Sequence, residues 1–118
     1  MSMKSVSAIL TIVVLLSLTL ACHAGKVDPS VVREKIKAGA LVVDVRTPAE
    51  VAAGAYPGAI NIPLDQVEKR LADFGDHKHP VVLYCRSGHR AGQAKAILEK
   101  NGFSDVTNAG GLKDMPPR

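Results

Sequence analysis

The sequence is poor in the residues that mark several common classes of protein. Its 118 residues include no Trp, two Tyr and two Phe, and they contain no run of basic residues. Aromatic side chains interleaved with a basic stripe are the usual signature of nucleic-acid binding, so that function is unsupported. There is also no internal repeat and no low-complexity tract, and the net charge is a mild +4. These absences favour one ordinary globular domain that acts on a small, anionic partner.

The first residues have the pattern of an export signal. Lys4 supplies a positive charge, and the chain then carries no charge until after Cys22, with a run of Ile, Leu and Val in between. We predict a signal peptide at residues 1–24, cleaved after Ala24, and export to the periplasm. The apolar run is short for a membrane-spanning helix, which needs about 20 residues, so a retained anchor is the less favoured alternative.

Cysteine is scarce, and the position of the first one leaves a second alternative open. The stretch Leu18-Thr19-Leu20-Ala21-Cys22 resembles a lipobox, in which Cys22 would be lipidated and become the mature N-terminus. Thr19 stands where lipoboxes usually have Leu, which favours ordinary cleavage. In either case Cys85 has no intramolecular disulfide partner. A single unpaired Cys in an exported protein predicts a free, reactive thiol.

The mature chain, residues 25–118, alternates between strand and helix patterns and is predicted to be one domain. This alternation predicts an α/β fold with a mostly parallel sheet covered on both faces by helices. Ligands of such sheets bind at the carboxyl ends of the strands. The predicted strands are 41–45, 60–62, 81–84 and 106–107, and the predicted helices are 28–39, 47–54, 64–74 and 91–100.

The stretch from Cys85 to Arg90 holds the best candidate for chemistry. It lies between a buried strand and a helix, where free backbone N–H groups and the helix dipole favour an anion. Arg86, Arg90 and His89 add positive charge nearby, so we expect a thiolate nucleophile in a cradle for a small anion. The alternative is a Cys that serves only as a small core residue. The polar neighbours and Gly88, which indicates a sharp bend, argue against it.

Four motifs in order resemble the rhodanese (sulfurtransferase) family, and together they cover nearly all of the chain after residue 25. The similarity is strongest to its small, single-domain periplasmic members. The resemblance implies a rhodanese-like single domain with a mostly parallel five-stranded sheet and helices on both faces. The motifs are Val43-Asp44-Val45-Arg46, Pro57-Gly58-Ala59-Ile60-Asn61-Ile62-Pro63-Leu64, Cys85-Arg86-Ser87-Gly88-His89-Arg90 and Asn108-Ala109-Gly110-Gly111-Leu112.

The resemblance also implies a reaction and the residues that carry it. Cys85 would take sulfur from thiosulfate as a persulfide and pass it to cyanide or a thiol, with no metal or organic cofactor. The protein is expected to be a monomer. The residues expected to bind the substrate are Arg86, Ser87, Gly88, His89 and Arg90.

Two further pairs of residues have open alternatives. Asp44 and Arg46 end a strong strand, so they form either an ordinary ion pair or a support for the Cys85 loop. His77 and His79 could suggest a metal site, but no third ligand is in view in this Lys- and Pro-containing segment. A solvated turn is the favoured interpretation there.

Two other functions compete with sulfur transfer. Cysteine phosphatases also use a Cys loop closed by an Arg, but in that pattern five residues separate Cys from Arg, whereas four separate Cys85 from Arg90. The shorter loop favours a pocket for sulfur over one for phosphate. The second is a non-catalytic module that binds an anion or senses redox state, whose thiol would be oxidised without turning over a sulfur donor.

Overall fold

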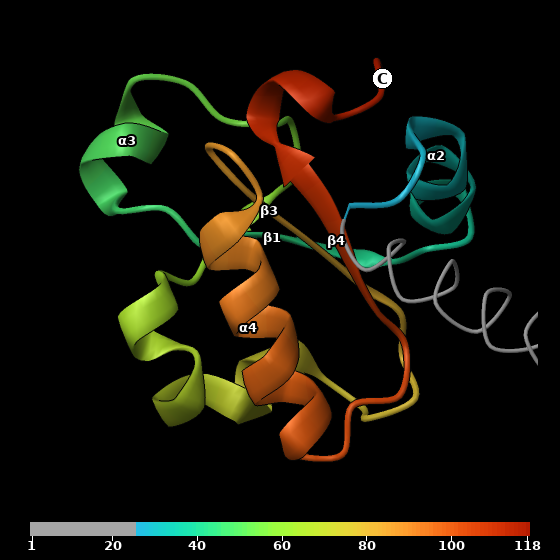
Figure 1. The fold of residues 1–118 in the computed structure, drawn as a ribbon, viewed down its shortest axis with the longest axis vertical. Coiled ribbons are helices and arrows are strands. Elements are labelled where there is room, and N and C mark those ends of the chain that lie inside the picture. Colours follow the sequence, from blue (N-terminus) through green and yellow to red (C-terminus); the bar gives the residue numbers. More distant parts are fainter. Residues whose placement is uncertain (1–25) are drawn as a thin grey trace, which may run out of the picture.

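Runs of Val and Leu form the two central strands of a four-stranded parallel sheet in the computed structural model (Figure 1). The structure describes residues 26–118, so the predicted signal peptide and Cys22 lie outside it. The strand order is β2-β1-β3-β4. The strands are β1 (Leu41–Asp44), β2 (Ile60–Asn61), β3 (Val81–Cys85) and β4 (Val106–Gly111).

The helices begin at capping residues that the sequence shows. Asp28 accepts a hydrogen bond from the backbone N–H of Ser30, and Thr47 forms a capping box with Glu50. Among the described residues, none of the helices has the length and apolar character that crossing a membrane requires. The helices are α2 (Pro29–Lys37), α3 (Pro48–Ala52) and α4 (His89–Lys100), with 3-10 segments η2 (Leu64–Gln66), η3 (Glu68–Phe74) and η4 (Leu112–Asp114).

Side chains that alternate along β1 and β3 build a hydrophobic core on each face of the sheet. Leu83 and Cys85 face α4 and pack with Leu98, whereas Val82 and Tyr84 face α2 and pack with Val32. Figure 1 shows α2 and α4 on opposite sides of the sheet. Full burial of one such aliphatic side chain stabilises the fold by about 1.5–3 kcal/mol. Because each face of the sheet has a core with its own helix, the predicted arrangement with helices on both faces is confirmed.

The predicted fifth strand is absent from residues 26–118, where the sheet has four strands. Next to β4, where a further strand could pair, the backbone N–H of Val27 donates one hydrogen bond to the carbonyl of Asn108. Asp28 then caps α2, and Pro29 has no N–H to donate, so the chain turns into a helix before a ladder forms. The prediction of five strands was wrong in this detail.

The predicted helix at 64–74 is also different in the structure. It consists of the two 3-10 segments η2 and η3, and Arg70 within η3 has non-helical backbone angles (φ −121°, ψ 35°). Val67 and Phe74 are nevertheless fully buried, as the apolar pattern predicts. The core contacts are therefore made without the regular i to i−4 hydrogen bonds of an α-helix.

Candidate active site

The candidate site lies where β3 ends at Cys85 and α4 begins at His89. The chain reverses in three residues, and Gly88 makes the turn with a left-handed φ of 94°. A Cβ atom at this position would also lie 3.1 Å from the Cα atom of Gly110 in β4. Glycine is therefore required both by the backbone angle and by the neighbouring strand.

The sulfur atom of Cys85 accepts hydrogen bonds from two backbone N–H groups of this turn. Its Sγ atom lies 3.0 Å from the backbone nitrogen of Gly88 and 3.5 Å from that of Ala91. Cys85 is a free cysteine, and only 1% of it is exposed. Both donors belong to the first turn of α4 and its N-cap, where unpaired N–H groups and the helix dipole stabilise negative charge. Two backbone donors at the start of α4 thus point at the sulfur atom of Cys85.

The turn is held in place by Asn108 of β4. The side-chain nitrogen of Asn108 donates to the carbonyl oxygen of Gly88 at 2.9 Å, and its side-chain oxygen accepts from the N–H of Gly110 at 2.9 Å. Asn108 is only 9% exposed, so these hydrogen bonds are shielded from water. The amide thus fixes the position of Gly88, the residue whose own N–H contacts Sγ.

The end of β4 also contacts the loop through its backbone. A Cβ atom built on Gly111 would lie 2.2 Å from the carbonyl oxygen of Arg86. Gly111 has φ −97°, an angle open to any residue, so the requirement for glycine here comes from the close approach alone. The loop and β4 therefore pack backbone against backbone.

An ion pair joins the start of α4 to α3. The two terminal nitrogens of Arg90 donate to the two carboxylate oxygens of Glu50 at 2.7 and 2.9 Å. This hydrogen bonding to Arg90, supported by the N–H of Thr47, lowers the pKa of Glu50 to about 2. The bidentate geometry fixes the guanidinium plane, and α3 therefore supports the loop from the side opposite β4.

The contribution of the Glu50–Arg90 ion pair to the stability of the fold should be lost in acid. The pKa of Glu50 is lower in the folded protein, so pairing stabilises the fold fully above the ordinary pKa of 4.5, and the contribution is lost as pH falls toward about 2. We expect Glu50→Gln, which keeps the oxygen that caps α3, to unfold at lower urea concentration than wild type at pH 6. The difference should shrink between pH 4.5 and pH 2.

A matched variant separates this effect from a change in net charge. Glu68→Gln removes one charge from η3, where no ion pair among residues 26–118 includes Glu68. A difference between Glu50→Gln and wild type that stays constant from pH 6 to pH 2 would show that the pair does not titrate as described.

Comparison with known proteins agrees with this geometry. A model of the rhodanese-like domain matches residues 28–115. The chain belongs to this family. The thiosulfate sulfurtransferase PspE of Escherichia coli K12 is 46% identical over 74 residues, which are 62% of this chain and 71% of that protein.

Two solved structures are similar as well. A rhodanese with anions from E. coli has a TM-score of 0.62 and 44% identity, and the match covers 66% of this chain and 95% of that one. The human single-domain sulfurtransferase TSTD1 has a TM-score of 0.69 and 30% identity, and the match covers 77% and 94%. This rhodanese-like chain is a sulfurtransferase enzyme.

The other predicted residues of this rhodanese-like domain lie around the thiol in different settings. Arg86, Ser87 and His89 are exposed on the turn. Arg90, predicted to bind the substrate, has its terminal nitrogens on Glu50. Its positive charge remains next to the loop, but one N–H donor of each terminal nitrogen is already engaged by Glu50.

Asp44 and Arg46 form a buried ion pair at the end of β1. Nη2 of Arg46 lies 2.7 Å from Oδ2 of Asp44 and also donates to the carbonyl of Gly54 at 2.7 Å. Within the described residues, neither side chain forms a hydrogen bond with residues 86–90. Their support of the loop stays a prediction, whereas Glu50, Asn108 and Gly111 make direct contacts with it.

The two histidines of the predicted turn contact other groups. The ring of His77 packs against that of Phe103 at a tilt of 39°, with centroids 4.3 Å apart. Nε2 of His79 lies 3.0 Å from the carbonyl oxygen of Gly39. Over residues 26–118, no three His, Cys, Asp or Glu side chains are grouped as metal ligands.

Proposed function

We propose that this enzyme moves sulfane sulfur from thiosulfate through a persulfide on Cys85. In the first step the Cys85 thiolate attacks the outer sulfur of thiosulfate. The S–S bond of the donor breaks, sulfite leaves with the electron pair, and Cys85 carries the transferred sulfur. In the second step cyanide or a thiolate attacks that sulfur, and Cys85 leaves as the thiolate.

The N–H groups that point at Sγ carry this proposal. The terminal sulfur of a persulfide lies about 2 Å beyond Sγ. The donors from Gly88 and Ala91 favour the anionic forms of the thiol and of the persulfide next to them. Fixed donors of this kind, as in oxyanion holes, generally contribute about 3 kcal/mol each to transition-state stabilisation.

The charges of the loop favour an anionic donor. Arg86 is exposed beside the thiol, and we assign the sulfonate oxygens of thiosulfate to its guanidinium. Ser87 and His89 are exposed on the same turn and are proposed to complete the substrate site. Arg90 contributes its positive charge while Glu50 orients it. The name of the PspE relative, a thiosulfate sulfurtransferase, supports this choice of donor.

The cellular setting is inferred from the sequence. The signal-peptide pattern of residues 1–24 supports export to the periplasm, with residues 25–118 as the mature rhodanese domain. The monomeric state and the absence of a cofactor remain predictions.

The mass of the intact protein tests the mechanism. Residues 25–118 would be incubated with thiosulfate, then with cyanide, with sulfite alone as the control. We expect a gain of one sulfur atom, mapped to the peptide with Cys85, and its loss to cyanide with formation of thiocyanate. A folded protein that takes up no sulfur would contradict the proposal. Phosphate release from a phosphomonoester, or uptake of oxygen alone from peroxide, would then indicate the phosphatase or the sensor.

A further inference from the structure

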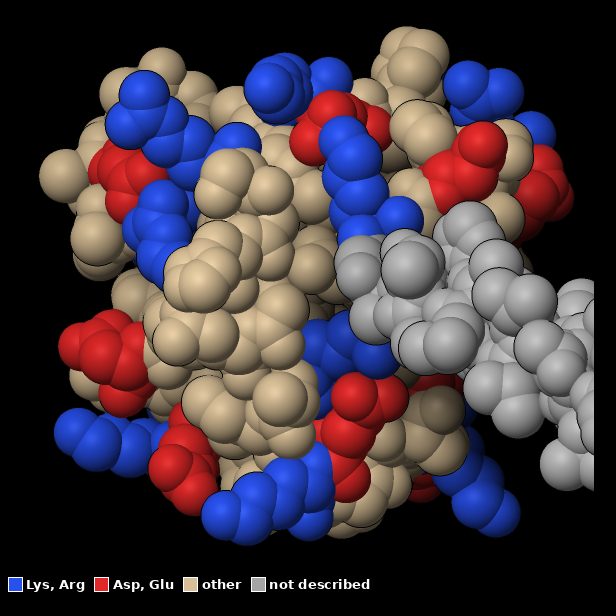
Figure 2. Space-filling view, in the orientation of Figure 1, with Lys and Arg blue, Asp and Glu red and all other residues tan. Residues whose placement is uncertain are grey.

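An ion pair lies against the glycines of β4 that contact the Cys85 loop. Nζ of Lys26 lies 3.2 Å from Oδ1 of Asp114, the last residue of η4. Charged side chains of both signs are interspersed on the face in Figure 2, so a pair of this kind is not unusual here. Exposed ion pairs generally contribute little, because water screens both charges. A role for this pair must therefore come from the other contacts of its atoms.

Asp114 also accepts a backbone hydrogen bond at the end of β4. Its side chain is 21% exposed, and Oδ2 accepts from the N–H of Gly111 at 2.8 Å. This hydrogen bond, and then the contact with Lys26, hold the pKa of Asp114 below its ordinary value of 3.8. The carboxylate is therefore ionised at neutral pH, with one oxygen on Lys26 and the other on the backbone of β4.

Gly110 contacts both this ion pair and the turn of the loop. A Cβ atom built on Gly110 would lie 2.7 Å from Oδ2 of Asp114 and 2.9 Å from Cδ of Lys26. A Cβ atom built on Gly88 of the turn would lie 3.1 Å from Cα of Gly110. The carboxylate, the carbon chain of Lys26 and the turn thus pack on one short piece of backbone that has no room for a side chain.

Gly111 connects Asp114 to the loop most directly. The N–H of Gly111 is held by Asp114, and a Cβ atom on Gly111 would lie 2.2 Å from the carbonyl oxygen of Arg86. The residue whose N–H the carboxylate holds is therefore the residue that packs against the loop. A change in this hydrogen bond reaches the loop through one residue of backbone.

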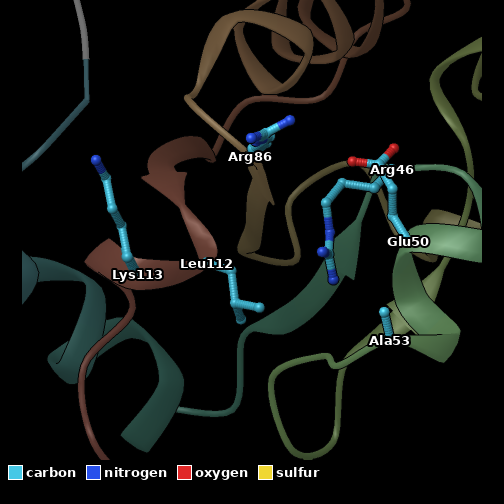
Figure 3. Close-up of a pocket in the computed structure, with 6 residues that line it drawn as sticks. All are labelled: Arg46, Glu50, Ala53, Arg86, Leu112 and Lys113. Atoms are coloured by element: carbon cyan, nitrogen blue, oxygen red, sulfur yellow. The ribbon is translucent and has the colours of Figure 1, made fainter.

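The same hydrogen bond holds one wall of the pocket beside the loop. It joins the two ends of the segment from Gly111 to Asp114, and the residues between them, Leu112 and Lys113, line the pocket. Figure 3 shows Lys113 on one side of this pocket, Glu50 and Ala53 of α3 on the other, and Leu112 between them. The carboxylate of Asp114 therefore fixes both the loop and the surface next to it.

We infer that Asp114 is a positioning residue for sulfur transfer. This inference rests on the proposed function. The carboxylate, oriented by Lys26, keeps the two glycines at the end of β4 against the turn, and the turn carries the N–H groups that contact Sγ of Cys85. Asp114 acts through this backbone, and no substrate contact or proton transfer is assigned to it. A displacement of about 1 Å at a reacting group can cost about 10²-fold in rate, so a small relaxation of β4 is enough to slow the attack on thiosulfate.

The rate of sulfur loading in a single turnover at saturating thiosulfate tests the inference. Asp114→Ala removes the acceptor of the Gly111 N–H, and we expect it to load at least about fivefold more slowly than wild type. Asp114→Asn keeps an oxygen that can accept this hydrogen bond, so it should recover to within about twofold of wild type. Quenched samples would be read by intact mass, at urea-free conditions well below the unfolding transition.

Asp105→Ala is the matched control. Asp105 precedes β4 at the end away from the loop, and its carboxylate lies 2.7 Å from Nζ of Lys35. The variant thus removes the same side chain and the same kind of ion pair beside the same strand. We expect it to load sulfur within about twofold of wild type, even where urea unfolding shows a loss of stability.

Backbone amide NMR signals report the turn without any reaction. The signals of Gly88 and Ala91, whose N–H groups contact Sγ, should move in Asp114→Ala and stay in place in Asp105→Ala. Should Asp114→Ala not fold, Lys26→Met, which keeps the carbon chain on Gly110 and removes the charge, should move the same signals.

Three results would overturn the inference. They are a smaller loss of loading rate in Asp114→Ala than in the expected result, no recovery in Asp114→Asn, and unchanged signals of Gly88 and Ala91. A wild-type protein that takes up no sulfur would overturn the proposed function instead. The amide signals would then still decide whether Asp114 positions the turn.

Discussion

Cys85→Ser is expected to abolish sulfur transfer. A hydroxyl has nearly the size of a thiol and can accept hydrogen bonds from the N–H groups of Gly88 and Ala91, so the fold should be kept. It is a far weaker nucleophile and cannot form a persulfide. Removing the attacking group of a covalent mechanism removes the whole route, so we expect kcat/KM with thiosulfate and cyanide to fall by at least about 10⁴-fold.

Cys85→Ala serves as the control for this prediction. It also lacks a nucleophile, but it leaves the two N–H groups without an acceptor, so it should lose the same activity and more stability than the Ser variant. Steady-state thiocyanate formation and urea unfolding measure the two effects. Activity of Cys85→Ser above roughly a hundredth of wild type would mean that sulfur reaches the acceptor without a covalent intermediate on Cys85.

Local sequence patterns were sufficient to predict most of the fold. The Val- and Leu-rich stretches predicted β1 and β3, and the capping residues Asp28 and Thr47 located the starts of α2 and α3. These features depend on residues close together in the chain, where periodicity and capping chemistry are informative. The fifth strand was expected only from the family resemblance. In place of that strand, the backbone N–H of Val27 makes one hydrogen bond to Asn108 of β4, and the chain then enters α2.

The thiol and its loop could be located from sequence, but the residues that hold the loop could not. Asn108 reaches Gly88 across 20 residues of chain, and Arg90 reaches Glu50 across 40. Such contacts depend on the order and register of the strands, which no local pattern gives. Glu50 was recognised only as a capping residue, and the Asn108–Gly111 segment only as a family motif. The strand order β2-β1-β3-β4, with β4 beside β3, explains why that motif lies against the loop.

Gly111→Ala should displace the Cys85 loop and so reduce activity strongly. The new Cβ atom would lie 2.2 Å from the carbonyl oxygen of Arg86 and 2.9 Å from its carbonyl carbon, and both are backbone atoms that cannot rotate away. Relief to an ordinary C···O contact of about 3.3 Å requires a shift of about 1 Å. Overpacking of this kind costs about 1–3 kcal/mol of stability. A misplacement of about 1 Å at a reacting group can cost about 10²-fold in rate.

Gly92→Ala makes the same chemical change one helical turn from the loop and should not have this effect. Its Cβ atom would lie 3.4 Å from the side-chain nitrogen of Asn108, close to ordinary contact, and Ala is favoured over Gly within a helix such as α4. Thiocyanate formation and urea unfolding of both variants, measured well below the unfolding transition, give the comparison. If Gly111→Ala keeps activity within about threefold of Gly92→Ala, the loop tolerates a shift of this size. The backbone contact between β4 and Arg86 would then matter for stability alone, and positioning of the thiol would rest on Asn108 and the Glu50–Arg90 pair.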